Sequence, residues 1–310
     1  MVFQRLYMMR MKQQTLGDDC VFEGKGLHTG KFSRMVVRPA PADTGILFRR
    51  TDLGGVTIEA LAQNISATAR NTTLSKGEAS VATLEHLMSA LTGMEIDNAF
   101  IELDNIEVPI LDGSARFYVE AFGRCGLAGQ DAPRRGISLP QAVEIKDEES
   151  GAWVRAEPSD RPSYEITVDF NSRVLGVQTA FWDETIDYSK EIAPCRTFVF
   201  FHEIEYLFRN NLIQGGDVDN AIVIVEHPVQ PGQIERLSHL FNLPALKVND
   251  NGYLNNLELH FPNECARHKL LDLMGDLRLC GGFLNARVTA FKPGHTINAR
   301  ISKAIREMLK

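Results

Sequence analysis

Several kinds of segment are missing from this sequence, and each absence excludes a class of protein. No run of 18 apolar residues occurs, so no transmembrane helix is predicted. Only five cysteines are present, far apart and without a CxxC, which excludes a disulfide scaffold or a zinc ribbon and favours free thiols in a reducing cytoplasm. Positive charge is also scarce: 33 Lys and Arg against 40 Asp and Glu give a net charge of −7. A nucleic-acid-binding protein needs a basic patch or stripe. The net charge therefore argues against nucleic-acid binding, although it leaves room for local basic clusters.

The residues that are present suit a globular chain with two domains. Its 310 residues are 44% hydrophobic and 24% charged, which is enough for a sizeable core. The first apolar residues are interrupted by charges and lack the continuous core of a signal peptide. We expect an N-terminal extension over residues 1–10, domains over 11–130 and 137–310, and a linker in the Pro-, Gly- and Arg-rich stretch 130–140.

The order of predicted elements favours an α+β fold of mostly antiparallel strands and layered helices. Strict alternation of strand and helix is missing, which argues against a doubly wound sheet. Each half has strands followed by a helix that begins near a histidine, in "TLEHLMSAL" and "ARHKLLDLMG", which indicates a duplicated unit. Helical spacing is predicted over 81–93, 115–129, 201–210, 265–277 and 295–310.

The helix predicted over 265–277 has an unusual polar face. At 100° per residue its leucines fall on one side, while His268, Asp272 and Asp276 align on the other at i, i+4 and i+8. Gly275 lies beside them and leaves room for close approach. One interpretation is an ordinary solvated face. The other is half of a metal site, in which His268 and Asp272 reach one Zn²⁺ and Asp276 orients another group.

The remaining ligand could come from Glu85-His86 in the first half. A lone Glu-His pair on a helix is usually a satisfied polar pair, and this one is not HExxH because position 90 is alanine. A histidine can nevertheless bind a metal while its neighbouring glutamate acts as a base toward water. His86, His268 and Asp272 would supply the three protein ligands typical of hydrolytic zinc, in a cleft between the domains.

Other motifs are weaker when each is taken alone. "FKPGHTIN" places His295 in a strand-to-helix turn, where it could be structural or act as a proton donor whose pKa Asp276 raises. "CRTFVF" could turn Thr197 toward a site and Phe198 and Phe200 toward an apolar channel, although plain strand packing explains the local pattern better. "GKGLHTG" over 24–30 fits neither common phosphate-loop pattern.

Together these segments resemble one family, UDP-3-O-acyl-N-acetylglucosamine deacetylase, the zinc amidase of lipid A biosynthesis. The resemblance runs from about residue 14 to about residue 305. The segments that carry it occur in the family's order: "GKGLHTG", "RPAPADTGILFRR", "TLEHLMSAL", "IDNAFIEL", "PILDGSA", "CRTFVF", "GGDVDNAIV", "ARHKLLDLMGDL" and "FKPGHTIN".

The resemblance implies a two-domain α+β fold with the site between the halves, and a role for each matched residue. Zinc is bound by His86, His268 and Asp272. Glu85 is the general base, His295 the general acid or charged stabiliser, Asp276 its partner, and Thr197 the hydroxyl near the developing oxyanion. An insert around 195–215 surrounds the acyl chain. The implied substrate contacts are Lys269, Phe170, Lys292, Phe198, Phe200, Ile204 and, less directly, His28.

The same resemblance sets expectations for the cellular context. It implies a bacterial cytoplasmic enzyme with UDP-3-O-acyl-N-acetylglucosamine as its partner, and neither nucleic acid nor a transmembrane segment. Some members continue into a 3-hydroxyacyl-carrier-protein dehydratase, so a fused gene product and a single-function version are both open. Residues 67–75 follow the family pattern only loosely and receive no role, and residues 226–262 look longer than in compact members.

Two competing functions remain open at this point. A metal-free sugar-nucleotide binding protein would keep Phe170 and Lys269 but need neither Glu85 nor His295. A zinc peptidase or another amidase would share the metal, although HExxH is missing. Metal analysis separates the first alternative, and an assay with UDP-acyl-N-acetylglucosamine against peptides separates the second.

Overall fold

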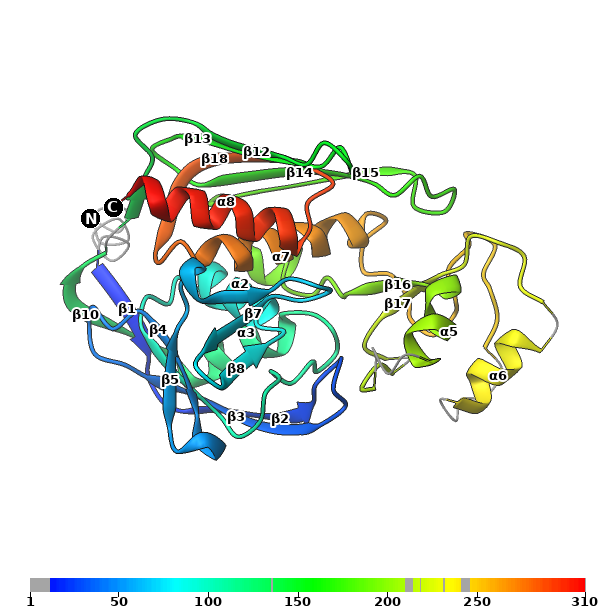
Figure 1. The fold of residues 1–310 in the computed structure, drawn as a ribbon, viewed down its shortest axis with the longest axis horizontal. Coiled ribbons are helices and arrows are strands. Elements are labelled where there is room, and N and C mark those ends of the chain that lie inside the picture. The colour runs from blue at the N-terminus through cyan, green and yellow to red at the C-terminus, as the bar shows by residue number, and fades with distance from the viewer. Residues whose placement is uncertain are drawn as a thin grey trace.

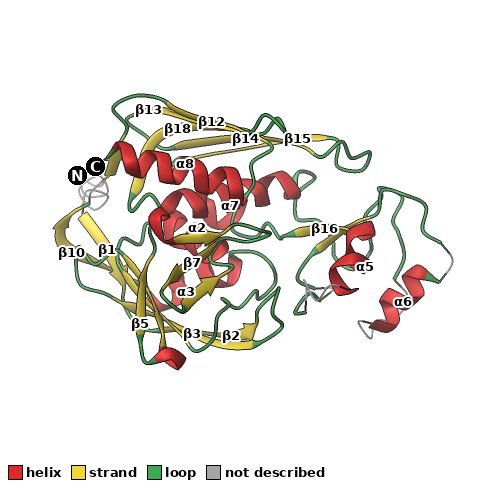
Figure 2. Cartoon of the chain, viewed as in Figure 1, coloured by secondary structure: helices red, strands yellow, loops and turns green. Residues whose placement is uncertain are grey.

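Two large sheets lie on either side of a layer of helices (Figure 1). The computed structural model describes residues 12–134, 136–209, 214–217, 219–230, 232–240 and 246–309. The N-terminal extension predicted over residues 1–10 lies outside this part of the chain. Figure 2 shows the helices in red between the two layers of strands.

The first sheet comes from the N-terminal half. Its strands run in the order β2-β3-β9-β4-β5, and all neighbours are antiparallel except β9 and β4. Alternate residues of the central strand, Ala99, Ile101 and Leu103, are buried, as expected where one face of a sheet packs on a core. The bounds are β2 (Cys20–Lys25), β3 (Phe32–Pro39), β4 (Ile46–Arg50), β5 (Val56–Glu59) and β9 (Ala99–Leu103).

The second sheet comes from the C-terminal half. Its strands run in the order β12-β13-β18-β14-β15, and again all neighbours on this path are antiparallel except one pair, β18 and β14. A short additional strand, β11, pairs with β18 in parallel. The bounds are β11 (Gly136–Ser138), β12 (Val143–Lys146), β13 (Trp153–Pro158), β14 (Ser163–Asp169), β15 (Val177–Asp183) and β18 (Phe283–Phe291).

The two halves share one topology. Strand for strand, both sheets have the same order and the same single parallel pair. In each half one helix precedes the central strand, α2 (Glu85–Gly93) and α7 (Glu264–Arg278), and another follows it, α3 (Arg116–Cys125) and α8 (His295–Met308). The structure therefore confirms the α+β fold and the repeated strand–helix unit predicted from the sequence.

The core lies between the sheets, where α2 packs against α7. Leu87 and Met88 of α2 and Leu270 and Met274 of α7 are fully buried in one apolar cluster that spans both halves. Within the described residues, no helix combines the length and the apolar character that crossing a membrane would require.

Smaller elements complete the chain. β1 pairs with β10, β6-β7-β8 form a three-stranded sheet, and β16 pairs with β17 in parallel. The bounds are β1 (Lys12–Leu16), η1 (Thr51–Leu53), η2 (Ala62–Asn64), β6 (Ile65–Ala67), β7 (Thr73–Lys76), β8 (Ala79–Ala82), β10 (Leu127–Pro133), α4 (Tyr188–Glu191), β16 (Phe198–Phe200), α5 (Phe201–Arg209), β17 (Ile222–Ile224) and α6 (Gln233–Leu240).

One predicted helix start was wrong, and the predicted linker contains paired strands. At the stretch 130–140, residues 127–133 form β10 against β1 of the first half and residues 136–138 form β11 against β18 of the second half, so its role as a linker stays a prediction. The helix predicted over 81–93 starts only at Glu85, since residues 79–82 pair as β8 and Thr83 has a positive φ of 58°. At residues 81 and 82, hairpin pairing of β8 with β7 therefore overrides the helical pattern.

The expectation of five free thiols was also wrong. Cys20, at the start of β2, and Cys125, at the end of α3, form a disulfide. Their Cα atoms lie 6.4 Å apart although 105 positions separate them in the sequence. The sequence spacing could not reveal this, because the tertiary fold brings the strand and the helix end together. The other three cysteines, Cys195, Cys265 and Cys280, are buried free thiols.

Candidate functional site

Three possible metal ligands converge where α2 meets α7. Asp272 Oδ1 lies 3.5 Å from His86 Nε2 and 3.5 Å from His268 Nε2. A tetrahedral zinc ion with bonds of about 2.1 Å needs ligand atoms about 3.4 Å apart. All three side chains are buried, so the interpretation of a solvated helix face is wrong.

The protonation states of the second-half ligands suit a cation. Burial lowers the pKa of His268 to about 3, so its imidazole is neutral. Its Nδ1–H donates to the Cys195 carbonyl at 3.0 Å, which leaves Nε2 as the ligand atom. Burial acts to raise the pKa of Asp272, but His268 and Lys269 outweigh it and hold that pKa well below its ordinary value.

An unsatisfied oxygen tests whether a metal fits this site. Asp272 Oδ1 is buried and accepts no hydrogen bond from any residue that the structure describes. An ionised oxygen left in that state is costly, and native proteins rarely tolerate it. The Nε2 atoms of His86 and His268 beside it complete a His₂Asp donor set, so a divalent transition cation fits.

Gly275 lets the two ligand-bearing helices approach each other. A Cβ at this position would lie 2.0 Å from the Glu85 carbonyl oxygen and 3.1 Å from the Ser89 nitrogen, both backbone atoms of α2. Backbone cannot move aside as a flexible side chain can, so glycine is required for this helix contact.

We therefore expect Gly275→Ala to destabilise the protein by about 1–3 kcal/mol or more, the usual cost of overpacking a core. Gly123→Ala is the matched control, because a Cβ on that helical glycine meets nothing within 4 Å. By helix propensity it should be neutral or stabilise by up to about 1 kcal/mol. Denaturant unfolding of both variants measures the difference, and equal stability would show that the helices are free to separate.

Glu85 lies at the first position of α2, next to the candidate ligand His86. Its Oε2 accepts the Thr72 backbone N–H at 3.1 Å. Burial raises the pKa of Glu85. A carboxylate in this environment takes up a proton more readily than one in water, as a general base must.

His295 faces the same site from the first residue of α8. Its Nδ1 lies 3.0 Å from Asp276 Oδ2, and its Nε2 lies 3.9 Å from both Glu85 Oε1 and Asp272 Oδ2. Burial acts to lower its pKa, but Asp276 and Glu85 outweigh it and raise the pKa to about 9. His295 is therefore an imidazolium at neutral pH, with Nε2 directed at the other catalytic-type groups.

One small cavity adjoins the insert. It has a volume of about 130 Å³, and Thr197, Phe198, Ile204 and His28 are among its lining residues. Phe200, predicted to line the same passage, is not among them. Its ring instead contacts Phe170 at 5.8 Å between centroids.

The predicted contacts to a nucleotide have diverse surroundings. Lys269 Nζ donates to Asp272 Oδ2 at 2.9 Å and lies 5.6 Å from the centre of the Phe198 ring. Lys292 Nζ lies 3.5 Å from Asp169 Oδ2. Phe170 is 40% exposed, so its ring is available to a ligand. Their roles in substrate binding stay predictions.

Sequence reasoning missed two supporting residues. The Thr72 hydroxyl donates to Asp276 Oδ1, and Asn298 Nδ2 donates to Asp276 Oδ2 at 2.9 Å. Both therefore hold the carboxylate that faces His295. Thr72 belongs to the stretch 67–75 that received no role, and no local pattern marks it. Asn298 could have been noticed, because it follows His295 by three residues and lies on the same helix face.

The comparisons with known proteins agree with this geometry. The family model for LpxC, UDP-3-O-acyl N-acetylglycosamine deacetylase, matches residues 13–238 and 242–307. The chain is 43% identical to the bifunctional enzyme LpxC/FabZ of Porphyromonas gingivalis and 40% identical to that of Bacteroides thetaiotaomicron, over 96% and 97% of its own length. It spans 65% of the length of each of these two relatives. It is 38% identical to the UDP-3-O-acyl-N-acetylglucosamine deacetylase of Thioalkalivibrio sulfidiphilus, over 95% of its own length and 90% of that protein's.

Proposed function

Because the chain belongs to the UDP-3-O-acyl N-acetylglycosamine deacetylase family, we propose that it is a zinc-dependent amide hydrolase of lipid A biosynthesis. It removes the N-acetyl group of UDP-3-O-acyl-N-acetylglucosamine and releases acetate. The observation that carries the proposal is the buried Asp272 Oδ1, which lacks a hydrogen-bond donor among the described residues and lies 3.5 Å from two imidazole nitrogens.

The proposed mechanism assigns a separate task to each group around the ligands. A zinc ion held by His86, His268 and Asp272 would polarise the amide carbonyl and lower the pKa of water toward neutral. Glu85 removes a proton from the attacking water, a task to which its raised pKa is suited.

The imidazolium of His295 then stabilises negative charge on the amide oxygen or protonates the leaving amine. Asp276 keeps it charged and oriented through the 3.0 Å contact to Nδ1. Thr197 lines the cavity, and we propose that its hydroxyl donates to the developing oxyanion. Atoms balance, since water supplies the hydroxyl of acetate and the proton of the free amine.

The two competing functions are less well supported. A metal-free sugar-nucleotide binding protein would have no use for three converging ligands with an unsatisfied carboxylate oxygen. A peptidase would need a cleft for an extended chain, whereas a 130 Å³ cavity lined by Phe198, Ile204 and Val223 suits an alkyl chain.

Acetate release from UDP-3-O-acyl-N-acetylglucosamine, measured before and after a chelator, tests the proposal. We expect activity that chelation removes and one equivalent of zinc restores. Chelator-resistant release would contradict the metal mechanism, and hydrolysis of peptides in place of the sugar nucleotide would contradict the substrate.

The acyl chain should contribute strongly to the reaction. Four methylenes buried at about 0.8 kcal/mol each would give roughly 3 kcal/mol, or about 200-fold in kcat/KM. We therefore expect UDP-N-acetylglucosamine without the acyl group to react at least about a hundredfold less efficiently.

Two variants show whether the insert supplies this discrimination. Ile204→Ala should narrow the difference between the two substrates, because Ile204 lines the cavity. Val177→Ala should leave it unchanged, because Val177 is 67% exposed on β15 and does not line the cavity. Equal efficiency of the two substrates with the wild-type protein would remove Phe198, Phe200 and Ile204 from the site.

Two expectations about the cellular context stay predictions. The relatives named LpxC/FabZ support a fused 3-hydroxyacyl-carrier-protein dehydratase in the full-length gene product. The bacterial cytoplasm remains the expected location. The mass of the endogenous protein and cell fractionation test these two points.

A further inference from the structure

A second group of possible metal ligands lies where the insert meets the segment after β17, at the point where two parallel strands end. Phe200 is the last residue of β16 and pairs with Ile224, the last residue of β17. Because the two strands are parallel, the segments that follow them start at the same end of this small sheet. His202 lies two residues beyond Phe200, in the first turn of α5. Glu226 and His227 lie two and three residues beyond Ile224. Register therefore brings these three residues together.

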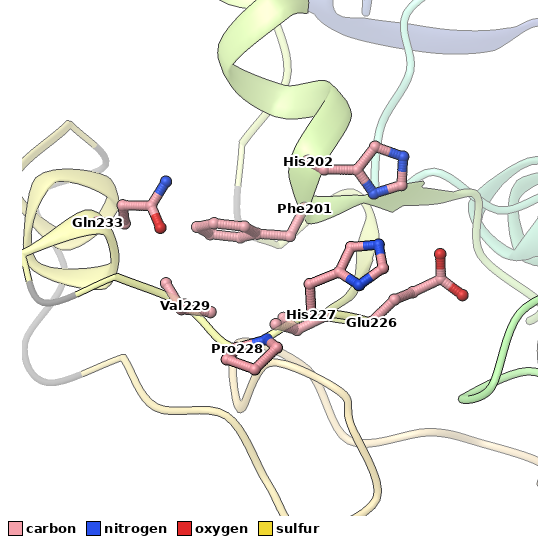
Figure 3. A pocket seen from close by; sticks show the side chains of 8 residues that line it. Phe201, His202, Glu226, His227, Pro228, Val229 and Gln233 are labelled. Carbon is pink, nitrogen blue, oxygen red and sulfur yellow. The ribbon is translucent and has the colours of Figure 1, made fainter.

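The three side chains face a common space. One ligand atom from each of His202, Glu226 and His227 lies within 4.8 Å of the other two. Figure 3 shows the two imidazoles next to each other, with the Glu226 carboxylate to one side. The ring centroids of His202 and His227 are 6.0 Å apart. Both histidines and Glu226 line a cavity of about 220 Å³. No Lys or Arg among the described residues forms an ion pair with Glu226.

Two imidazoles and a carboxylate are the donor set of borderline transition cations, whereas magnesium and calcium prefer oxygen alone. We propose that His202, Glu226 and His227 form a second site for a divalent transition cation, of which Zn²⁺ is the representative. It is separate from the His86–His268–Asp272 site and does not depend on the function proposed above. We name it the insert site.

Solvent exposure distinguishes the insert site from the His86–His268–Asp272 site, which we name the deep site. His202 and His227 are exposed and Glu226 is half-buried, whereas all three deep ligands are buried. Exposed side chains lose conformational freedom when a metal orders them, whereas packing already holds the buried ligands. We therefore expect weaker binding at the insert site, with water completing the coordination.

A cation bound at the insert site would link the start of α5 to the segment that follows β17. The Phe200 ring stacks on the His202 ring at 5.6 Å with an angle of 26°. Phe200 in turn contacts Phe198 at 6.4 Å, and Phe198 contacts the deep ligand His268 at 6.3 Å. Because α5 also carries Ile204 of the proposed acyl cavity, occupancy of the insert site would order that wall.

Equilibrium dialysis against increasing Zn²⁺, with metal counted by mass spectrometry, tests the insert site directly. The wild-type protein should bind two equivalents, and His202→Ala and His227→Ala should each bind one. His260→Ala is the matched control, since His260 is an exposed histidine in the same half and outside the cluster; it should bind two. Zinc binding that is the same in the wild-type protein and in both cluster variants would overturn the proposal, whether or not the deep site is filled.

A second readout separates a site from adventitious binding. With the deep site already filled, further Zn²⁺ should slow hydrogen exchange of the amides in α5 and β17 in the wild-type protein but not in His227→Ala. With one equivalent of zinc, His227→Ala should deacetylate at the wild-type rate, because His227 contacts none of the proposed catalytic groups. Equal slowing of exchange in both proteins would show that the cation acts elsewhere.

Discussion

Replacing His86 by alanine is expected to remove the deep metal and to lower kcat/KM for deacetylation at least about a hundredfold. Loss of even a partner that only orients a metal ligand commonly costs 10–100-fold, so loss of a ligand should cost more. His86 is the position to test first, because it is the one ligand of the three that comes from α2, whereas His268 and Asp272 both lie on α7. Metal content after dialysis and acetate release measure the two effects.

Asp272→Ala should have the same effect on metal and activity, with an additional loss of stability. Lys269 donates to Asp272 Oδ2 at 2.9 Å and would keep a half-buried positive charge without its partner. Zinc should raise the melting temperature of the wild-type protein, since a ligand that binds only the folded state stabilises it, and should raise that of either variant less, through the insert site alone. His260→Ala again serves as the control that retains metal and activity.

Full zinc occupancy of the deep site in both variants would contradict the ligand assignment. To keep the insert site out of the measurement, the same substitutions can be made in the His227→Ala background. In that background, the zinc bound per protein should fall from about one equivalent to none. This measurement does not require an activity assay.

The dependence of kcat/KM on pH should be bell-shaped, and Asp276→Asn should move its alkaline limb to lower pH. His295 acts as a cation, so activity is present below its pKa and is lost as the pH rises through about 9. Asp276 is the strongest of the carboxylates that raise this pKa against the effect of burial. Without the charge of Asp276, the pH of the alkaline limb should fall by about 1–3 units, the usual pKa change when an adjacent opposite charge is lost.

Glu85→Gln should change the same profile in a different way. The amide keeps the shape of the side chain but cannot accept the proton, so the rate should fall by about 10²–10⁴-fold across the whole range while zinc stays bound. Glu85 Oε1 lies 3.9 Å from His295 Nε2. The groups therefore titrate together, and each limb reports a macroscopic value.

Profiles measured for the wild-type protein and both variants at fixed zinc decide between these roles. An alkaline limb that stays in place in Asp276→Asn would show that Asp276 does not keep His295 charged. Loss of zinc from Glu85→Gln would show that Glu85 contributes to the metal site and is not only a base.

The sequence by itself determined the local geometry of the second half of the site. Periodicity of 100° per residue is a property of the helix alone, so His268, Asp272 and Asp276 could be assigned to one face without further information. The repeated order of strands and one helix was also visible, because the same turn and periodicity signals recur in both halves. Both expectations agree with α7 and with the matched sheets.

Only the tertiary structure decided whether the polar face of α7 is exposed to solvent or buried. The answer depends on α2, which approaches α7 so closely that Gly275 has no room for a side chain, and the two helices are almost 200 residues apart in the chain. Thr72 was invisible for the same reason, since its hydroxyl bonds to Asp276 across 204 positions. The Cys20–Cys125 disulfide and the insert site likewise join segments that no local pattern connects. Hydrogen bonds, ligand sets and disulfides depend on distances in space, and a single sequence records only distances along the chain.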